Sequence, residues 1–367
     1  MKKWNIGWGT IAQCNMNCQF CYSKKRRVTG KPLGYKEWKK FIDENHKMIR
    51  SINYGTGENT LSVEWFQLVD YIRHHYPSIP QALTTNGYLS EAIKDISMRD
   101  IFVRAIDEVD VSLDFSDKSL HNAFRGQENA YDWALKTLEL CAQNNKSTTI
   151  VFLGSKKNLF RENIDGLFSI AEKYGALLRM NVYRPTEGID EVSRKFIADY
   201  DSIVDMLRYI AGEYSVIALN DTLFSTLLTN ETVKDPTGID SLRILADGSI
   251  TPNTYLIKSN YTVADIREYK VLKKIENKNS VDGIIQRKVP SECYGCVYSG
   301  TCSGGVYDRR FLWYGNLDHK DPYCPGKLLN EVEPCITITQ KDFHSVHDGY
   351  LPTIFFHPSK NLDSKSN

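Results

Sequence analysis

Short apolar segments alternate with longer amphipathic segments through the first half of the chain. Between the apolar segments, apolar residues recur with the 3.6-residue period of a helix. Six strand–helix units in a row predict a parallel sheet with right-handed crossovers, built either as an open doubly wound sheet or as a partial barrel. The apolar runs lie at about 5–11, 51–54, 80–85, 108–114, 147–153 and 177–183, and the helical stretches at about 34–50, 61–75, 90–104, 129–145 and 160–174.

Four unusual turns follow the first four predicted strands. A cysteine-rich loop follows the first strand, YGTGEN follows the second, TTNGYL follows the third, and the fourth ends in SLDFSD. Ligands of parallel α/β folds bind at the carboxyl ends of the strands. We therefore expect these four turns to share one rim and to hold the chemistry of the protein.

The pattern changes in the second half. Residues from about 190 to 235 are helical and then irregular, and SLRILADGSITPNTYL predicts two short strands joined by a hairpin turn. A polar helix is expected at about 264–277, and the ending PSKNLDSKSN has the composition of a disordered tail. The sequence thus predicts a core at 1–205, a smaller C-terminal domain at 206–357 and a polar tail at 358–367.

Charge and length exclude several classes of function. The 46 Lys and Arg are balanced by 45 Asp and Glu, so no net field favours binding to nucleic acid or to an acidic membrane. No apolar run of 18 residues occurs, and the amino terminus, MKKWNIGWGT, lacks the apolar stretch of a signal peptide. We expect a cytoplasmic protein, whose nine cysteines would stay reduced instead of forming disulfides.

Three of these cysteines follow the first predicted strand. Cys14, Cys18 and Cys21 lie in CNMNCQFCYS and are one thiolate short of a closed tetrahedral site. Thiolates select zinc or iron–sulfur clusters over harder metals. A structural zinc would need a distant fourth ligand, since the next histidine is His46, whereas a four-iron cluster would keep one iron open for substrate or cofactor. Three unligated buried thiols are the remaining alternative.

The C-x3-C-x2-C spacing in the first strand-to-helix loop, with Phe20 before the third cysteine, resembles the radical S-adenosylmethionine (SAM) superfamily. The resemblance implies a partial (β/α)6 barrel with a SPASM-like or twitch-like iron–sulfur extension at the C-terminal end. It also implies that the open iron binds SAM and that one electron, from a donor such as flavodoxin or ferredoxin, cleaves the sulfonium. The resulting 5′-deoxyadenosyl radical would abstract hydrogen from a C–H bond.

The loop after the second predicted strand also matches the family. Its sequence GTGE, which includes Gly57 and Glu58, resembles the Gly-Gly-Glu loop whose backbone receives the ammonium group of SAM. Thr56 stands where the first glycine of the motif is usual. The alternative interpretation is an ordinary glycine-rich turn.

The end of the fourth predicted strand provides further matches. Ser112 and Asp114, followed by His121 and Arg125, resemble an S-x-D and H-x-x-x-R stretch in which the serine and the arginine contact SAM. A hydroxyl suits the ribose or the carboxylate of SAM, and a guanidinium pairs with a carboxylate. Arg125 could instead be a solvated residue at a helix start, and His121 is expected to be structural. The implied SAM contacts are Phe20, Gly57, Glu58, Ser112, Asp114 and Arg125.

A second group of cysteines lies in the last quarter of the chain. It consists of Cys293, Cys296, Cys302 and Cys324, which together make a complete four-thiolate site. Without context, zinc would be the default metal for such a site. Downstream of a radical SAM core, the group resembles the SPASM extension, which carries auxiliary four-iron clusters.

The chain departs from the SPASM pattern at two positions. Asn253 occupies the place of a usual cysteine, and Val306 lies where a further cysteine would follow Cys302. We therefore expect one auxiliary cluster in addition to the catalytic one, with zinc in the second site as the alternative. Cys141 lies in a helical pattern and is expected in the core, and Cys335 is expected to be a plain thiol.

The resemblance identifies the machinery and leaves the substrate open. Many SPASM proteins crosslink or epimerise ribosomally made peptides, and others act on small molecules such as sugars, nucleosides or aminocyclitols. The first strand begins near residue 4, so we expect no amino-terminal leader-binding domain, and a separate leader-binding protein could take its place. A precursor peptide is our leading hypothesis, a small-molecule substrate the second and a zinc-stabilised binding module the third. No catalytic acid or base is identified, although His344 and His347 are candidates.

Overall fold

The computed structural model of the chain describes residues 2–24, 32–229, 231–278, 289–326, 334–340, 343–347 and 351–359. Within these residues, eleven strands form a single sheet in the order β10-β9-β8-β1-β2-β3-β4-β5-β6-β11-β7. The strands are β1 Trp4–Trp8, β2 Ile49–Tyr54, β3 Gln81–Thr85, β4 Glu108–Ser112, β5 Ser147–Gly154, β6 Leu177–Val182, β7 Ser215–Leu219, β8 Ser241–Ile244, β9 Ser249–Thr251, β10 Ala264–Asp265 and β11 Ile354–His357.

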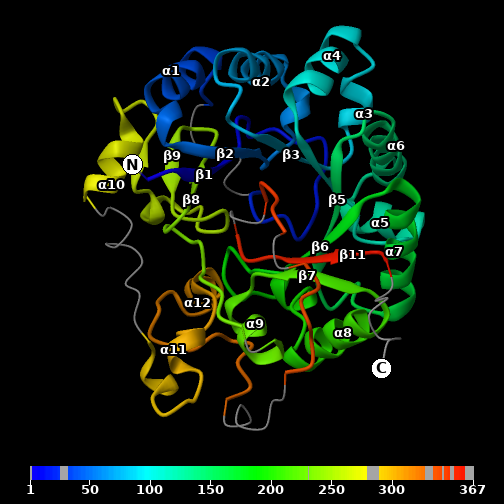
Figure 1. Cartoon of the computed structure of the whole chain (residues 1–367), viewed down its shortest axis with the longest axis vertical. Coiled ribbons are helices and arrows are strands. Elements are labelled where there is room, and N and C mark those ends of the chain that lie inside the picture. Colours follow the sequence, from blue (N-terminus) through cyan, green and yellow to red (C-terminus); the bar gives the residue numbers. More distant parts are fainter. Residues whose placement is uncertain are drawn as a thin grey trace.

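The helices lie between these strands and after β10 (Figure 1). The α-helices are α1 Tyr35–Asn45, α2 Val63–His75, α3 Leu89–Ala92, α4 Ile96–Ala105, α5 Lys118–Arg125, α6 Ala130–Gln143, α7 Arg161–Tyr174, α8 Tyr200–Glu213, α9 Thr222–Leu228, α10 Val271–Lys278, α11 Ser299–Cys302 and α12 Tyr307–Tyr314. Short 3-10 helices are η2 His46–Met48, η3 Asn59–Leu61, η4 Ser193–Lys195, η5 Ser259–Tyr261 and η6 Ser291–Cys293.

Strands β1 to β6 follow the same order in the sheet as in the chain, and each pairs in parallel with the next. A doubly wound sheet would instead reverse its strand order at a switch point. Right-handed crossovers that always step in the same direction leave their helices on one face, and Figure 1 shows α1 to α7 along the outside of the sheet. The six strands therefore form the partial barrel that the sequence predicts.

The helix predicted at about 61–75, which is α2 in the structure, shows why these segments form helices. Ser62 caps the amino terminus of α2, because its hydroxyl accepts a hydrogen bond from the amide of Trp65 (3.3 Å). The apolar stripe of α2, which includes Trp65, Leu68, Val69 and Ile72, is buried against the sheet. Burial of one apolar face thus fixes this helix on the outside of the barrel.

Three predicted helices have different bounds in the structure. The helix expected at 34–50 ends at Asn45, and β2 begins at Ile49. The helix expected at 90–104 is divided into α3 and α4, because the side chain of Asp95 caps the amino terminus of a new helix. The helix expected at 264–277 begins later, because Ala264–Asp265 pair in antiparallel fashion with β9. Pairing with β9, which precedes these residues in the chain, overrides the local helical pattern there.

The second half of the chain extends the barrel sheet at both edges. Strand β8 pairs in parallel with β1, and the predicted hairpin turn leads into β9, with the amide of Gly248 donating to the carbonyl of Leu245 (2.9 Å). At the other edge, β11 lies between β6 and β7 and runs antiparallel to both. The last described strand thus joins β7, the edge strand, to the barrel strands.

The predicted domain boundary between residues 205 and 206 falls within α8. Strands from both sides of that boundary share one sheet, so the division into 1–205 and 206–357 stays a prediction. Of the predicted tail, 360–367 lie outside the described residues. No helix in the described part of the chain is long and apolar enough to cross a membrane.

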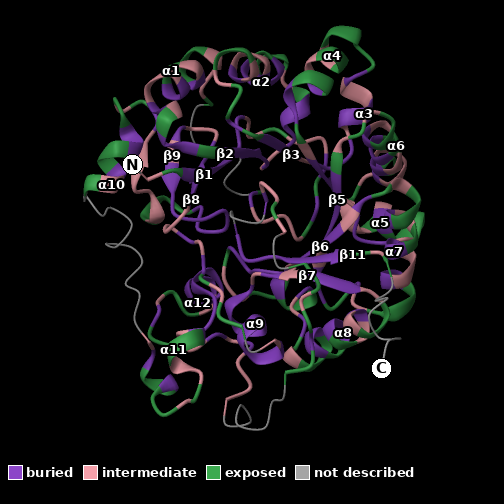
Figure 2. Cartoon of the chain, in the orientation of Figure 1, coloured by how far each residue is buried: buried purple, intermediate pink, exposed green. Residues whose placement is uncertain are grey.

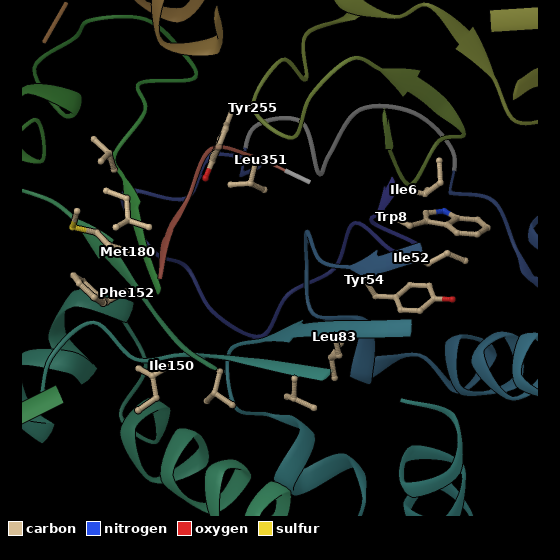
Figure 3. Close-up of a cluster of buried hydrophobic side chains, with 14 of the residues drawn as sticks. Ile6, Trp8, Ile52, Tyr54, Leu83, Ile150, Phe152, Met180, Tyr255 and Leu351 are labelled. Atoms are coloured by element: carbon tan, nitrogen blue, oxygen red, sulfur yellow. The ribbon is translucent and has the colours of Figure 1, made fainter. Parts of the chain in front are cut away.

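The main core lies between the strands and the outer helices. Strand residues are mostly buried, and the helices carry exposed residues on their outer faces (Figure 2). Figure 3 shows Ile6, Trp8, Ile52 and Tyr54 on the outer side of β1 and β2, where Trp8 packs edge-on against Phe41 of α1 with ring centroids 5.3 Å apart. Since alternate strand residues point to opposite faces, the remaining strand positions face the barrel interior.

Candidate active site

A cavity of about 190 Å³ opens at the carboxyl ends of the barrel strands. The cysteine loop after β1, the glycine loop after β2 and the end of β4 all contribute to its wall, so the structure brings the expected turns to one rim. Five of the six residues proposed to contact SAM line this cavity together with all three amino-terminal cysteines: Cys14, Cys18, Cys21, Phe20, Gly57, Ser112, Asp114 and Arg125.

The cysteine loop is held against its neighbours by backbone contacts. A Cβ atom on Gly57 would lie 2.5 Å from the carbonyl oxygen of Gln13, and the φ angle of Gly57 is +66°. Only glycine therefore suits this position. The amide of the next residue, Glu58, donates to the same carbonyl (2.8 Å), and Asn86 after β3 donates to the side chain of Asn15 (2.8 Å).

Thr56 adopts a strained backbone conformation at the cavity wall. Its φ angle is +78°, which is rare for a β-branched residue and is found mainly where surrounding contacts enforce it. The guanidinium of Arg243, from β8, donates to the Thr56 hydroxyl and to the carbonyl of Gly55. The hydroxyl of Tyr22 lies 2.9 Å from the Thr56 hydroxyl. A threonine can therefore stand in for the usual glycine because two neighbouring side chains hold it.

Glu58 does not line the cavity. Its carboxylate is buried and accepts hydrogen bonds from the Thr60 hydroxyl (2.7 Å), the Thr85 hydroxyl (3.0 Å) and the Asn86 amide (2.8 Å). Burial raises the pKa of Glu58, against the effect of these donors. The side chain braces the loops after β2 and β3, which leaves only the backbone of this residue for its predicted contact with SAM.

Arg125 is oriented by a buried carboxylate. Its Nε donates to Asp114 Oδ2 (2.6 Å), while Asp114 Oδ1 accepts from the amide of Leu153 (2.9 Å). The guanidinium lies over the ring of Phe20, 5.2 Å from its centroid. His121 is buried and its Nδ1 accepts from the amide of Asp114 (3.1 Å). Burial and the nearby Arg125 hold the pKa of His121 well below its usual value, so this histidine is neutral.

The three amino-terminal thiols fit a cluster with one open iron. Cys14, Cys18 and Cys21 face the same cavity, and burial raises the pKa of the Cys18 thiol to about 11. Three thiolates with no fourth protein ligand are the donor set of a four-iron cluster that keeps one coordination site open. Among the residues that the structure describes, no group of three His, Cys, Asp or Glu side chains is placed to hold a single metal ion.

The second group of cysteines lines a separate, small cavity. Cys293, Cys296, Cys302 and Cys324 face it together with leucines of α9, Leu223 and Leu227. Burial raises the pKa of the Cys302 thiol to about 12 and also raises the pKa values of Cys293 and Cys324. Four thiols around one apolar cavity are the donor set of an iron–sulfur cluster, whereas the zinc alternative would need thiols placed around a single ion, which the described residues do not show.

The two departures from the SPASM pattern are packed without cysteines. Asn253 is buried, and its side-chain NH2 donates to the Thr237 hydroxyl (2.8 Å) and to Asp308 Oδ2 (3.2 Å). Its Oδ1 accepts from the amide of Tyr255 (2.7 Å). Val306 is fully buried. The amide side chain of Asn253 is therefore used for hydrogen bonds inside the protein.

Several residues that line the cavity were not predicted from the sequence. Arg179 and Asn181 point inward from β6, Arg184 follows that strand, and Tyr255 comes from the C-terminal part of the chain. The alternation in LLRMNV, where apolar residues face the core, was the signal that could have found the first two. No motif marks Arg184, whose ion-pair partner lies 124 positions along the chain.

The two candidate histidines lie in different environments. His344 is exposed, whereas His347 is buried inside the barrel, with its Nε2 3.0 Å from Asp110 Oδ2. Burial opposes the charged form of His347, but Asp110 and Glu108 outweigh it and raise its pKa. Neither histidine lines the cavity beside the cysteines.

Comparison with known proteins agrees with this geometry. The sequence matches the Radical SAM superfamily over residues 9–163. Mycofactocin maturase MftC of Mycobacterium tuberculosis is 23% identical over 330 residues, which cover 87% of this chain and 82% of MftC. The AdoMet-dependent heme synthase of Methanosarcina barkeri is 24% identical over 355 residues, which cover 88% of this chain and 97% of the synthase.

The fold is also similar to that of a solved structure. Streptococcus suis SuiB, in a crystal structure bound to precursor peptide SuiA, superposes with a TM-score of 0.69 at 18% identity, covering 88% of this chain and 76% of SuiB. The family match includes the three cysteines, the loop after β2 and the end of β4. Residues 9–163 of the chain therefore form a radical SAM domain, and the protein is an enzyme.

Proposed function

We propose that this radical SAM enzyme modifies a ribosomally made precursor peptide. The observation that carries the proposal is the shared cavity, in which three thiols face the strained glycine loop and the Arg125–Asp114 pair. The similarity to MftC, a maturase, and to SuiB, solved with its precursor peptide, supports a peptide as the substrate.

The proposed roles follow from the positions of the residues. Cys14, Cys18 and Cys21 hold the catalytic four-iron cluster. When bound, that cluster supplies the electron that cleaves SAM and so generates the 5′-deoxyadenosyl radical. Arg125 pairs with the carboxylate of SAM, and Ser112 offers its hydroxyl at the end of β4.

Other residues keep SAM in place and protect the radical. Asp114 fixes the guanidinium plane of Arg125 through a hydrogen bond, and the ring of Phe20 packs against the guanidinium. The backbone of 55–58 receives the ammonium group of SAM. Apolar side chains of the wall, including Met16 and Phe152, limit access of water and of stray hydrogen donors.

We further propose that the four carboxyl-terminal cysteines hold one auxiliary four-iron cluster. The shared cavity that they line beside α9 supports this assignment. An electron donor such as flavodoxin or ferredoxin completes the system, and a separate leader-binding protein would present the precursor peptide.

The first experiment is anaerobic incubation of the reconstituted enzyme with SAM and a reductant. We expect 5′-deoxyadenosine and methionine in equal amounts. Addition of the short peptides encoded next to the gene should yield a peptide of changed mass. An enzyme that contains the four-iron cluster yet forms no 5′-deoxyadenosine would show that the proposed chemistry is wrong.

A small-molecule substrate is the second candidate, because the heme synthase of Methanosarcina barkeri matches over nearly its whole length. This second candidate predicts that 5′-deoxyadenosine formation increases when a tetrapyrrole or another small metabolite is added, and not when peptides are added. Unchanged peptides together with a modified tetrapyrrole would decide in its favour.

A further inference from the structure

Two arginines lie on the wall of the cavity where the barrel meets the C-terminal part of the chain. Arg179 points inward from the middle of β6, and Arg184 follows the end of that strand. Both side chains are buried. Arg184 is packed under the ring of Tyr255, with its guanidinium carbon 4.8 Å from the ring centroid.

Each of these arginines pairs with a carboxylate that accepts hydrogen bonds from only some of its guanidinium N–H groups. Arg184 donates from Nε to Asp308 (2.6 Å) and from Nη1 to the carbonyl of Val182 (2.8 Å), while its Nη2 is buried and makes no hydrogen bond. Arg179 donates from Nη2 to Asp110, while its Nε and Nη1 are buried and make no hydrogen bond. Buried donors without partners are rare in folded proteins, so they point to a bound group.

The unsatisfied atoms define the chemistry of that group. Planar guanidinium donors match the two oxygens of a carboxylate. Asn181, which lies between the two arginines in the sequence, also lines the cavity, and its buried Oδ1 accepts no hydrogen bond. The guanidinium donors of Arg179 and Arg184, together with the acceptor Oδ1 of Asn181, suit a ligand in which a carboxylate lies next to an N–H group.

The carboxylate of SAM itself is assigned elsewhere in the cavity. Its proposed partners, Ser112 and Arg125, belong to β4 and to the end of α5 beside the cysteine loop. Strand β6 lies two strands farther along the sheet, which corresponds to a separation of about 10 Å. The partners of Arg184, which are Asp308 and Tyr255, come from the C-terminal part of the chain.

We propose that Arg179 and Arg184 bind a carboxylate of the substrate, and that Asn181 accepts a hydrogen bond from the adjacent N–H. This inference rests on the proposed function and specifies the substrate as an acid: a peptide with a free C-terminus or an acidic side chain, or a small carboxylic acid.

The test uses the anaerobic holoenzyme saturated with SAM, so that the SAM site is filled. N-acetylglycine is compared with the neutral N-acetylglycinamide at equal ionic strength. We expect the acid to raise the Tm by about 2 °C more than the amide. This difference should vanish in the R184Q/D308N variant, which removes the ion pair without leaving a buried charge, and should persist in R104Q, which changes an arginine on the outer face of α4.

A second variant covers the case in which the double variant does not fold. R179K keeps the positive charge but loses the planar donors, so it should reduce the advantage of the acid by at least half. Equal effects of acid and amide on the wild-type enzyme would overturn the inference. The inference would also be overturned if, in a folded variant, either R184Q/D308N or R179K, the acid still raised the Tm more than the amide by as much as in the wild-type enzyme.

Three tripeptides then identify the source of the carboxylate. They are N-acetyl-trialanine as the free acid, its C-terminal amide, and the amide with a central aspartate. Stabilisation by the first points to a peptide C-terminus, and stabilisation by the third points to an acidic side chain. If N-acetylglycine binds and none of the tripeptides does, the carboxylate site stands and the peptide substrate of the proposed function is wrong.

Discussion

At the scale of single residues, Cys18 is the thiol that connects the cysteine loop with α5. Its Sγ lies 3.4 Å from the carbonyl oxygen of Arg125, and its side chain is buried. In the proposed site, loss of this thiolate would remove an iron ligand that no neighbouring cysteine can replace. We expect Cys18→Ala to reduce the iron content from about eight to about four per chain and to abolish 5′-deoxyadenosine formation.

The matched control for this substitution is Cys141→Ala. Cys141 is also buried, but it lies in the core on α6 and lines neither of the two cysteine cavities. Iron analysis of the reconstituted proteins should find the full iron content in this control. Retained cleavage of SAM in the Cys18 variant would contradict the assignment of the catalytic cluster.

Arg125 provides the second test at this scale. Arg125→Lys keeps the positive charge near Asp114 but loses the planar donors that match a carboxylate. We expect the Kd for SAM to rise about tenfold, which corresponds to about 1.4 kcal/mol, with the iron content unchanged. Equilibrium binding to the reconstituted enzyme measures this change. An unaltered Kd would show that Arg125 does not contact SAM.

The residues that the sequence identifies are those whose chemistry depends on close spacing. Cys14, Cys18 and Gly57 belong to short motifs, because a cluster and a tight turn each need neighbouring positions. Arg184 could not be found in this way, since its role depends on Asp308, which is distant in the chain and near in the fold. Nor does the motif reveal that the side chain of Glu58 turns away from the cavity.

At the scale of elements, the segment 343–347 enters the barrel from the C-terminal part of the chain. The hydroxyl of Ser345 donates to Glu108 (2.7 Å), and His347 lies between the carboxylates of Glu108 and Asp110. Both carboxylates belong to β4, so the segment is anchored to a central strand. The charge of His347 should therefore contribute to stability in a pH-dependent way.

The direction of that dependence follows from the raised pKa of His347. A raised pKa in the folded state means that the stabilisation is complete below the unfolded pKa, near 6.5, and is lost as the pH rises through the folded value. We expect His347→Gln to lower the Tm by roughly 5 °C at pH 6 and by much less at pH 9. Thermal unfolding of the anaerobic holoenzyme at both pH values measures the difference.

His74 supplies the control for this experiment. It lies on the exposed face of α2, and His74→Gln should change the Tm little at either pH. A gap between wild type and His347→Gln that is constant from pH 6 to pH 9 would show that folding does not raise the pKa of His347.

The elements that the sequence predicts are those specified by local periodicity. Each of the first five barrel strands is followed by a segment with helical periodicity, and the resulting crossovers leave few topologies open. The positions of β8 and β11 could not be predicted in the same way. β8 joins β1 and β11 joins β6, and in each case the paired residues are far apart in the chain. The local sequence of such a short strand does not indicate which strand it pairs with.

At the scale of the whole molecule, the two groups of cysteines lie in separate parts of the structure. The first group lines the cavity at the carboxyl ends of the barrel strands, and the second lies beside α9 and α11, toward the lower part of Figure 1. Arg309 connects α12 to this region, because it pairs with both Asp221, which caps α9, and Asp321. The site for SAM can therefore be assembled without the second group.

This separation leads to opposite expectations for the two cysteine groups. Cys296→Ala should lower the iron content to about four per chain while leaving the SAM site intact. We expect 5′-deoxyadenosine formation without substrate within about threefold of wild type, a small change on the barrier scale, but loss of product from the true substrate. Cys335→Ala, at an exposed thiol outside both groups, is the control. If Cys296→Ala kept eight irons, or lost SAM cleavage as completely as Cys18→Ala, the two sites would not be independent.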